Sequence, residues 1–275
     1  MDTEYIVHLL TYFILYSFFG WVLESVSKTI AQRKLINSGF LNGPICPIYG
    51  YGAVIMILAL GFLKDNIPLL FIVSFFVLSI WEYIVGILLE KIFKTKYWDY
   101  SENKFNIKGR VCLKNSIFWG VLGVIFIKYI HPFIESKLVL IPLNILIYVD
   151  IILYIALIVD TIVSSIKTAK LEKAMLKVEE IETNIKQKLE ELKEQNKNKS
   201  SKSLSDLEQI IRELRINQTK LKIKLYKRAK RLKEAFPSMK SESITNFLNE
   251  KVDLKALKQY MKKVKNKINN KPEKK

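Results

Sequence analysis

Five apolar runs occupy the first 166 residues, and each is close to the roughly 20 residues that an α-helix needs to cross a bilayer. They are Tyr5–Leu23, Ile45–Leu63, Ile67–Leu89, Ser116–Ile134 and Leu138–Val159. Lys128 and His131 interrupt the fourth run, which is either a partial span or a helix covered by its neighbours. The runs predict an all-α polytopic membrane protein with about five transmembrane helices.

Most of the net positive charge lies in residues 167–275. Residues 1–166 have 13 Lys/Arg and 11 Asp/Glu, whereas residues 167–275 have 31 and 15. This asymmetry excludes an ordinary soluble enzyme and predicts a transmembrane domain at 1–166 followed by a basic soluble part. Two cysteines are too few for a disulfide scaffold. The acidic start lacks the positive n-region of a signal peptide, so we expect the first run to be a retained span.

Basic residues in the short loops predict the orientation. Residues 24–44 carry three Lys/Arg and residues 90–115 carry seven, whereas the loop near Lys64 carries one. These counts place the N-terminus outside, and both basic loops and the basic C-terminal part in the cytosol. We expect a multi-pass protein of the plasma membrane.

The chain contains an internal repeat with an offset of 66 residues. Gly20–Thr29 aligns with Gly86–Thr95, and both segments read G-x-x-L-E-x-[VI]-x-K-T. The predicted units are parallel span-loop-span repeats, at about 5–63 and 67–134, followed by a fifth span at about 138–159.

Equivalent residues of parallel repeats can meet at the axis that relates them. The pairs would be Glu24 with Glu90, and Cys46 with Cys112. The alternative for the acidic pair is that each Glu forms an i,i+4 ion pair with a Lys near a helix end. On the reducing side of the membrane the cysteines are expected to pack as small apolar residues, without a disulfide or a metal.

Acidic residues inside apolar runs are candidates for function, because each costs about 2.5–3.5 kcal/mol at the bilayer centre. Glu82, Asp150 and Asp160 have this setting. Glu82 needs a hydrogen-bond donor, for which His8, Tyr49 or a backbone group is expected. A hydrogen-bonded anchor between helices is the alternative to a functional site.

Two segments between the apolar runs have distinctive compositions, and the first of them cannot begin as a regular helix. The first combines glycine and proline with apolar residues and predicts a re-entrant or tightly turned segment. Its candidate site residues are Gly43, Pro44, Cys46, Pro47, Tyr49 and Gly50. The second is the aromatic-rich interfacial loop that contains Trp98, Asp99, Asn106 and Arg110, with Asp99 and Arg110 expected to form an ion pair.

The remaining sequence, 167–275, predicts helices. Apolar residues at 3,4 spacing indicate an antiparallel hairpin over 167–236, or a coiled-coil dimer, with Glu182 and Gln218 at two core positions. Pro237 ends this part. Residues 237–275 form a basic tail in which Asp253–Ile268 is an amphipathic helix, expected at an anionic lipid surface. Nucleic-acid binding is disfavoured because the tail has few aromatic residues.

Several of these motifs together resemble a known family. They are Gly20-Trp21-x-x-Glu24, Gly39-Phe40-Leu41-x-Gly43-Pro44-x-Cys46-Pro47-Ile48-Tyr49-Gly50, Glu82-Tyr83, Glu90, Trp98-Asp99-Tyr100-Ser101, Phe105-Asn106, Gly109-Arg110-x-Cys112-Leu113 and Trp119-Gly120. The chain resembles, over residues 8–160, the CmpB-like bacterial membrane family of ABC-transporter type IV. The resemblance implies a transport role and supplies no catalytic residues.

The expected function is that of a permease-like subunit, with no cofactor, powered by a separate ATPase because the chain has no Gly-x-x-x-x-Gly-Lys-[Ser/Thr] motif. Glu24, Glu82, Glu90 and the segment Gly43–Gly50 would line the path or the moving interface. Five spans are few, so a homo-oligomer or a second membrane subunit is expected. The alternatives are a scaffold or sensor that recruits partners through its helical hairpin, and an intramembrane lipid-modifying enzyme with Glu82 and Asp99 as acid and base.

Overall fold

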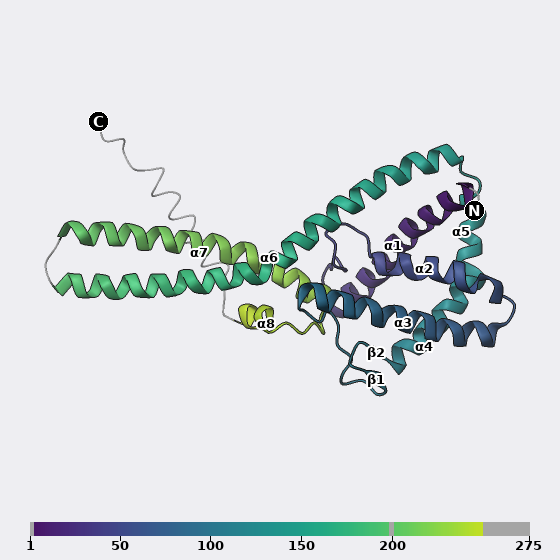
Figure 1. Ribbon diagram of the computed structural model, residues 1–275, viewed down its shortest axis with the longest axis horizontal. Helices are drawn as coiled ribbons and strands as arrows, with labels where there is room; N and C mark the ends of the chain where they lie inside the picture. Colours follow the sequence, from purple (N-terminus) through teal and green to yellow (C-terminus); the bar gives the residue numbers. More distant parts are fainter. Residues whose placement is uncertain (1–2, 198–200, 250–275) are drawn as a thin grey trace. The chain divides into compact units, whose positions relative to one another are not determined.

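The protein is almost entirely helical in the computed structural model, which describes residues 3–197 and 201–249 (Figure 1). The elements are α1 (Thr3–Gln32), α2 (Pro47–Leu60), the 3-10 helix η1 (Gly61–Leu63), α3 (Ile67–Phe93), β1 (Asn106–Ile107), β2 (Val111–Cys112), α4 (Leu113–Ile125), the π-helix η2 (Phe126–Ile130), α5 (His131–Leu138), α6 (Leu143–Lys197), α7 (Ser201–Ala235) and α8 (Glu242–Asn249). The two strands form a small antiparallel ladder inside a loop.

Four helical stretches are long and apolar enough to cross a membrane, which confirms the all-α polytopic class. They are Thr3–Gln32, Ile67–Phe93, Leu113–Leu138 and Leu143–Leu171. The second predicted span is a shorter apolar helix, Pro47–Leu63. It begins at Pro47 because proline fits the first helical turn, and because Cys46 before it has the extended conformation of an N-cap. The predicted turned segment before this helix is present as bends over residues 39–44.

The weakest predicted span is a continuous helical stretch that contains one π-helical segment, Phe126–Ile130. Pro132 follows in the first turn of α5 and cannot donate a backbone hydrogen bond. A wider turn ahead of it accommodates the ring. His131, expected to interrupt the span, bonds through Nδ1 to the Tyr16 hydroxyl at 3.0 Å, so this polar side chain has a partner among the helices.

Small residues bring the helices of each predicted repeat close together. The Tyr49 ring of α2 lies against Gly20 of α1, and Gly50 lies against Ser17. In the second pair, Gly123 of α4 lies against Ser74 of α3. Such contacts are typical of membrane helices, which lack a hydrophobic driving force for association and gain stability from close packing.

The chain forms two compact units. Of the described residues, the first comprises 3–166 together with 232–241, and the second comprises 167–197, 201–231 and 242–249. Helix α6 contributes to both. The core of the first unit is built from α1, α2, α3, η2 and the start of α6, with Tyr12, Leu60 and Leu70 each at most 3% exposed.

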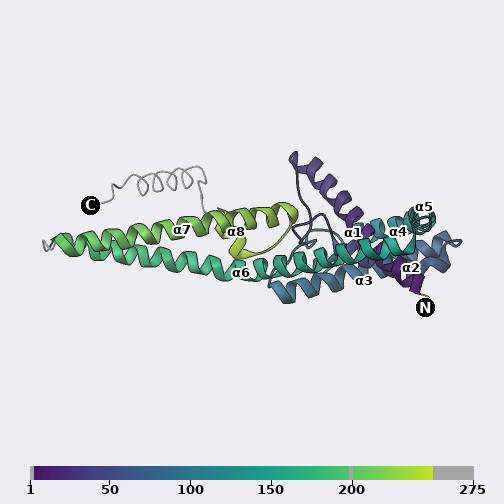
Figure 2. The same cartoon turned by 90° about the horizontal axis from the view of Figure 1, so that it is seen from above.

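In the second unit, α6 and α7 lie side by side in both views (Figures 1 and 2). The polar residues at the two predicted core positions contact each other, because Gln218 Nε2 donates to Glu182 Oε2 at 3.3 Å. Lys222 also donates to Glu182, at 3.2 Å. Each side chain that interrupts the apolar pattern is therefore paired. The predicted amphipathic helix Asp253–Ile268 lies outside the described residues.

Candidate functional site at the loop face

Three segments that are distant in the sequence meet at one end of the first unit, which we call the loop face. They are the α1–α2 connection (33–46), the α3–α4 connection (94–112) and the return segment (232–241) that includes the end of α7. Their shared core is aromatic. The Tyr97 ring lies 5.8 Å from Phe40 and 5.0 Å from Phe236, and the Tyr97 residue is 3% exposed.

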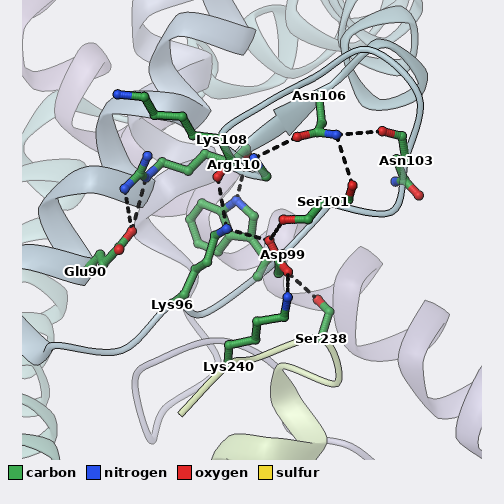
Figure 3. Close-up of polar contacts among 12 residues, drawn as sticks. Glu90, Lys96, Asp99, Ser101, Asn103, Asn106, Lys108, Arg110, Ser238 and Lys240 are labelled. Carbon is green, nitrogen blue, oxygen red and sulfur yellow. Dashed lines mark hydrogen bonds and ion pairs between the residues drawn. The ribbon is translucent and has the colours of Figure 1, made fainter. Parts of the chain in front are cut away.

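The carboxylate of Asp99 is the centre of the polar network at this face (Figure 3). It accepts from Lys96 Nζ at 2.5 Å and from Ser101 Oγ at 2.6 Å, and it forms an ion pair with Lys240 of the return segment. The Asp99 side chain is only 4% exposed. Burial opposes its ionisation, but the bonds from Lys240, Lys96 and Ser101 outweigh it and hold the pKa of Asp99 well below its usual range.

The return segment is also bonded through its backbone. Lys96 and Lys240 exchange two backbone hydrogen bonds, at 3.2 and 2.9 Å, in an antiparallel bridge. On the other side, Lys28 of α1 donates to the Ala235 carbonyl, and its ammonium lies 5.1 Å from the centre of the Phe236 ring. Lys34 of the first loop also bonds Glu234 at 2.7 Å, so α1 and both connecting loops of the first unit hold the same short segment.

The predicted ion pair between Asp99 and Arg110 is wrong. Arg110 instead bonds Glu90 at the end of α3, with Nε and Nη2 at 3.1 and 2.7 Å from Oε2. Trp98 Nε1 donates to the Arg110 carbonyl at 2.9 Å. Asp99 is paired with Lys96 and Lys240, and Arg110 is paired with Glu90, so each charge has another partner.

Asn106 and a glycine fix the tip of the second loop. Asn106 Nδ2 donates to the carbonyls of Ser101 and Asn103 at 3.1 and 2.8 Å, and its Oδ1 accepts from Gly109 N at 3.0 Å. Gly109 has φ +66°, and a Cβ there would overlap the Asp99 and Ser101 side chains. The loop conformation that presents Asp99 thus requires glycine at this position.

Glu82 connects the second loop to the membrane-spanning helices. It lies in α3 and is 6% exposed. Its carboxylate accepts from the Tyr100 hydroxyl at 3.2 Å and from Trp119 Nε1 at 2.9 Å. The sequence-based expectation of a bond from His8 or Tyr49 is wrong, because the loop folds back and supplies Tyr100. Burial and the charge of Glu82 both raise the pKa of Tyr100, so its hydroxyl remains a donor.

Glu24 and Glu90 each contact the loop of their own predicted repeat. Lys28 donates to Glu24 at 2.8 Å, in the i,i+4 pair that was the alternative for this motif, and to Ser38 at 2.9 Å. Cys46 Sγ lies 3.6 Å from Glu24 Oε2. In the second repeat Arg110 takes the place of the lysine as the partner of Glu90. The helix-ending ion pair is therefore present in the first copy only.

The acids of α6 fasten it to α1 and to the first loop. Asp160 accepts from the backbone N of Gly43 at 2.8 Å and from Asn42 Nδ2 at 2.8 Å, which holds the turn before the exposed Pro44. Asp150 accepts from the Thr11 hydroxyl at 2.7 Å. Both acids are hydrogen-bonded anchors, the alternative considered for residues of this kind.

The two cysteines have corresponding places. Cys46 is the N-cap of α2, Cys112 is the N-cap of α4, and both are buried. Asn103 Nδ2 lies 3.4 Å from Cys112 Sγ. Among residues 3–197 and 201–249, no group of three or more His, Cys, Asp or Glu could hold a metal ion.

Sequence reasoning missed the return segment as part of this site. The apolar 3,4 pattern predicts only that Pro237 ends a helix, and it does not include Phe236, Met239 or Lys240. The signal was present, because Phe236 and Met239 are apolar residues beside a proline in a stretch that is otherwise rich in charge. Met239 is 2% exposed, as expected of a docked segment.

These features define a polytopic, membrane-embedded helical protein whose connecting loops form one ordered face. The family described as "putative ABC-transporter type IV" matches residues 11–165, which is more than half of the chain, and the chain belongs to this family. The match covers the spans and both connecting loops and ends where the second unit begins. No curated protein and no solved structure matches the chain.

Proposed function

We propose that the chain is the membrane subunit of a transporter that works with a separate P-loop ATPase and is not itself an enzyme. Its family and its apolar helices support a membrane-embedded transport role. The chain has no Gly-x-x-x-x-Gly-Lys-[Ser/Thr] motif, so ATP hydrolysis must come from a partner. The basic loops favour a plasma-membrane orientation in which the loop face and the second unit are cytosolic.

The hydrogen bond between Tyr100 and Glu82 carries this proposal. In a transporter driven from the cytosol, a hydrogen-bond network can carry coupling from the cytosolic loops to groups inside the membrane. Tyr100 follows Asp99, which bonds the return segment through Lys240, and Tyr100 itself bonds the buried Glu82. A shift of the loop therefore displaces the donor of an acid within α3.

The moving interface of this proposal includes the close contacts of α1 with α2. Tyr49 and Gly50 lie directly against α1, and the turn at Gly43 is tied to Asp160. Glu24 and Glu90 lie where the spans meet the loops, so they would respond to the same movement. The small number of spans favours a homo-oligomer or a second membrane subunit for a complete path.

Affinity purification of the tagged full-length chain in mild detergent, followed by mass spectrometry, tests the partnership. The proposal predicts a P-loop ATPase in stoichiometric amount. Glu82→Gln and Tyr100→Phe should then lower ATP hydrolysis by the complex without loss of the complex. Tyr129→Phe is the matched control, because Tyr129 is 64% exposed. A chain that purifies without any ATPase, or variants with unchanged hydrolysis, would refute the proposal.

A scaffold or sensor is the second candidate, favoured by the second unit. This unit has its own packed helices and lies beyond the family match. The purification distinguishes the two candidates, because a scaffold predicts soluble partners whose capture depends on the exposed side chains of α6 and α7. The proposed lipid contact of the basic tail at 237–275 is compatible with both.

A further inference from the structure

We propose that the end of α3 carries a binding site for the phosphate headgroup of an anionic phospholipid. The site is a hollow of about 350 Å³ lined by Ile87, Glu90, Lys91, Lys94 and Arg110. Its lining residues are not those of the Glu82 hydrogen-bond network.

The hollow has an excess of positive charge. Glu90 is neutralised by its bond to Arg110, whose guanidinium also lies 5.6 Å from the centre of the Tyr83 ring. The Arg110 side chain is 16% exposed and is held from two sides. Lys91 and Lys94 are exposed and form no ion pair with any residue that the structure describes. Two ammonium groups are therefore available to an anion at a preformed wall.

The position on α3 favours a lipid over a soluble anion. An apolar stripe with a four-residue period runs along the helix to the hollow. Its members are each at least half exposed: Ile72, Phe76, Ile80, Ile84, Leu88 and Ile92. Acyl chains can lie along this stripe while the headgroup reaches the lysines. Basic pockets at the ends of membrane helices are a known arrangement for anionic headgroups.

Because the site is at the C-terminal end of a helix, anion binding there depends on the two lysines. The C-terminus of a helix carries partial negative charge, which attracts cations and repels an anion. Lys94 is the C-cap of α3, and Lys91 lies in its last turn. The ammonium groups must therefore supply the attraction for the phosphate, so their removal should abolish most of the binding.

Native mass spectrometry of the purified full-length chain tests the site by titration with dioleoyl-phosphatidylglycerol. Dioleoyl-phosphatidylcholine and inorganic phosphate are the comparison probes. We expect saturable retention of phosphatidylglycerol and much weaker retention of phosphatidylcholine. Each lysine near an anionic lipid contributes about 1 kcal/mol to binding. The Lys91→Gln/Lys94→Gln variant should therefore bind phosphatidylglycerol about thirtyfold more weakly. Lys104→Gln/Lys108→Gln is the control, because it removes the same charge from the neighbouring loop.

A further variant tests the hollow without a change of charge. Ile87→Trp fills the space beside the lysines and should weaken phosphatidylglycerol binding, while the thermal unfolding temperature reports whether the chain stays folded. If the two double variants lost phosphatidylglycerol affinity equally, the attraction would be a diffuse effect of surface charge, which would overturn the proposal. Equal retention of the two lipids would also overturn it. If millimolar inorganic phosphate displaced phosphatidylglycerol, the hollow would be a site for a soluble anion, and the proposal of a lipid site would be wrong.

Discussion

Asp99→Asn tests how much the negative charge at the centre of the loop face contributes to its stability. The substitution keeps an oxygen that can accept from Ser101, but it removes the charge that binds Lys96 and Lys240. A hydrogen bond to a charged group contributes about 1.5–3 kcal/mol net. The Lys96 bond belongs near the middle of this range, because the Asp99 side chain is only 4% exposed but the Lys96 side chain is 21% exposed. We therefore expect the loop 94–112 to lose about 2 kcal/mol of local stability.

Hydrogen exchange followed by mass spectrometry measures this loss. A decrease of about 2 kcal/mol corresponds to roughly thirtyfold faster opening, so amides of residues 94–112 and 232–241 should exchange faster by that factor. Glu102→Gln removes the same charge from an exposed position in the same loop and should leave exchange near the wild-type rate. The reasoning fails if Asp99→Asn behaves like this control, or if only residues 232–241 respond.

Because the folded state lowers the pKa of Asp99, its ionised form stabilises the fold above its unfolded pKa of about 3.9, and the protection factors of amides at 232–241, which correct for the intrinsic exchange rate at each pH, should decrease as the pH falls below about 4. Gly50→Ala should lower the thermal unfolding temperature through overpacking of about 1–3 kcal/mol, whereas Gly61→Ala, with open space around it, should not. Phe236→Ala should release the return segment from the aromatic cluster, seen as protease cleavage within 232–241 that Lys240→Gln produces to a smaller extent.

The fold class could be predicted from the sequence because the signal is continuous over each span. Apolar runs of about 20 residues leave few alternatives, and each run lies mostly within one helical stretch of the structure, although α1 continues to Gln32 and the last stretch runs from Leu143 to Leu171. The second run shifts least, and only at its start. Pro47 sets where the helix begins, so the Gly43–Cys46 part of the pattern is turn rather than helix.

The partners of the polar residues could not be predicted in the same way. A buried acid shows that a donor is needed, but the donor depends on how a distant loop folds. Glu82 is bonded by Tyr100 and Trp119, which lie 18 and 37 positions away in the sequence. The Asp99 partner Lys240 is more distant still, and a single cation in a lysine-rich tail carries no signal of its own. Spacing along one helix did predict the Glu24–Lys28 pair, because that contact is local.

The central claim is that a separate ATPase acts on the loop face, and cross-linking in native membranes tests it most directly. A lysine-reactive cross-linker applied to membranes that contain the full-length chain, followed by peptide mass spectrometry, identifies what lies against residues 94–112. The account predicts cross-links from Lys104 and Lys108, which are exposed, to a P-loop ATPase. Cross-links from these lysines only to other copies of the chain or to proteins without a P-loop would contradict it.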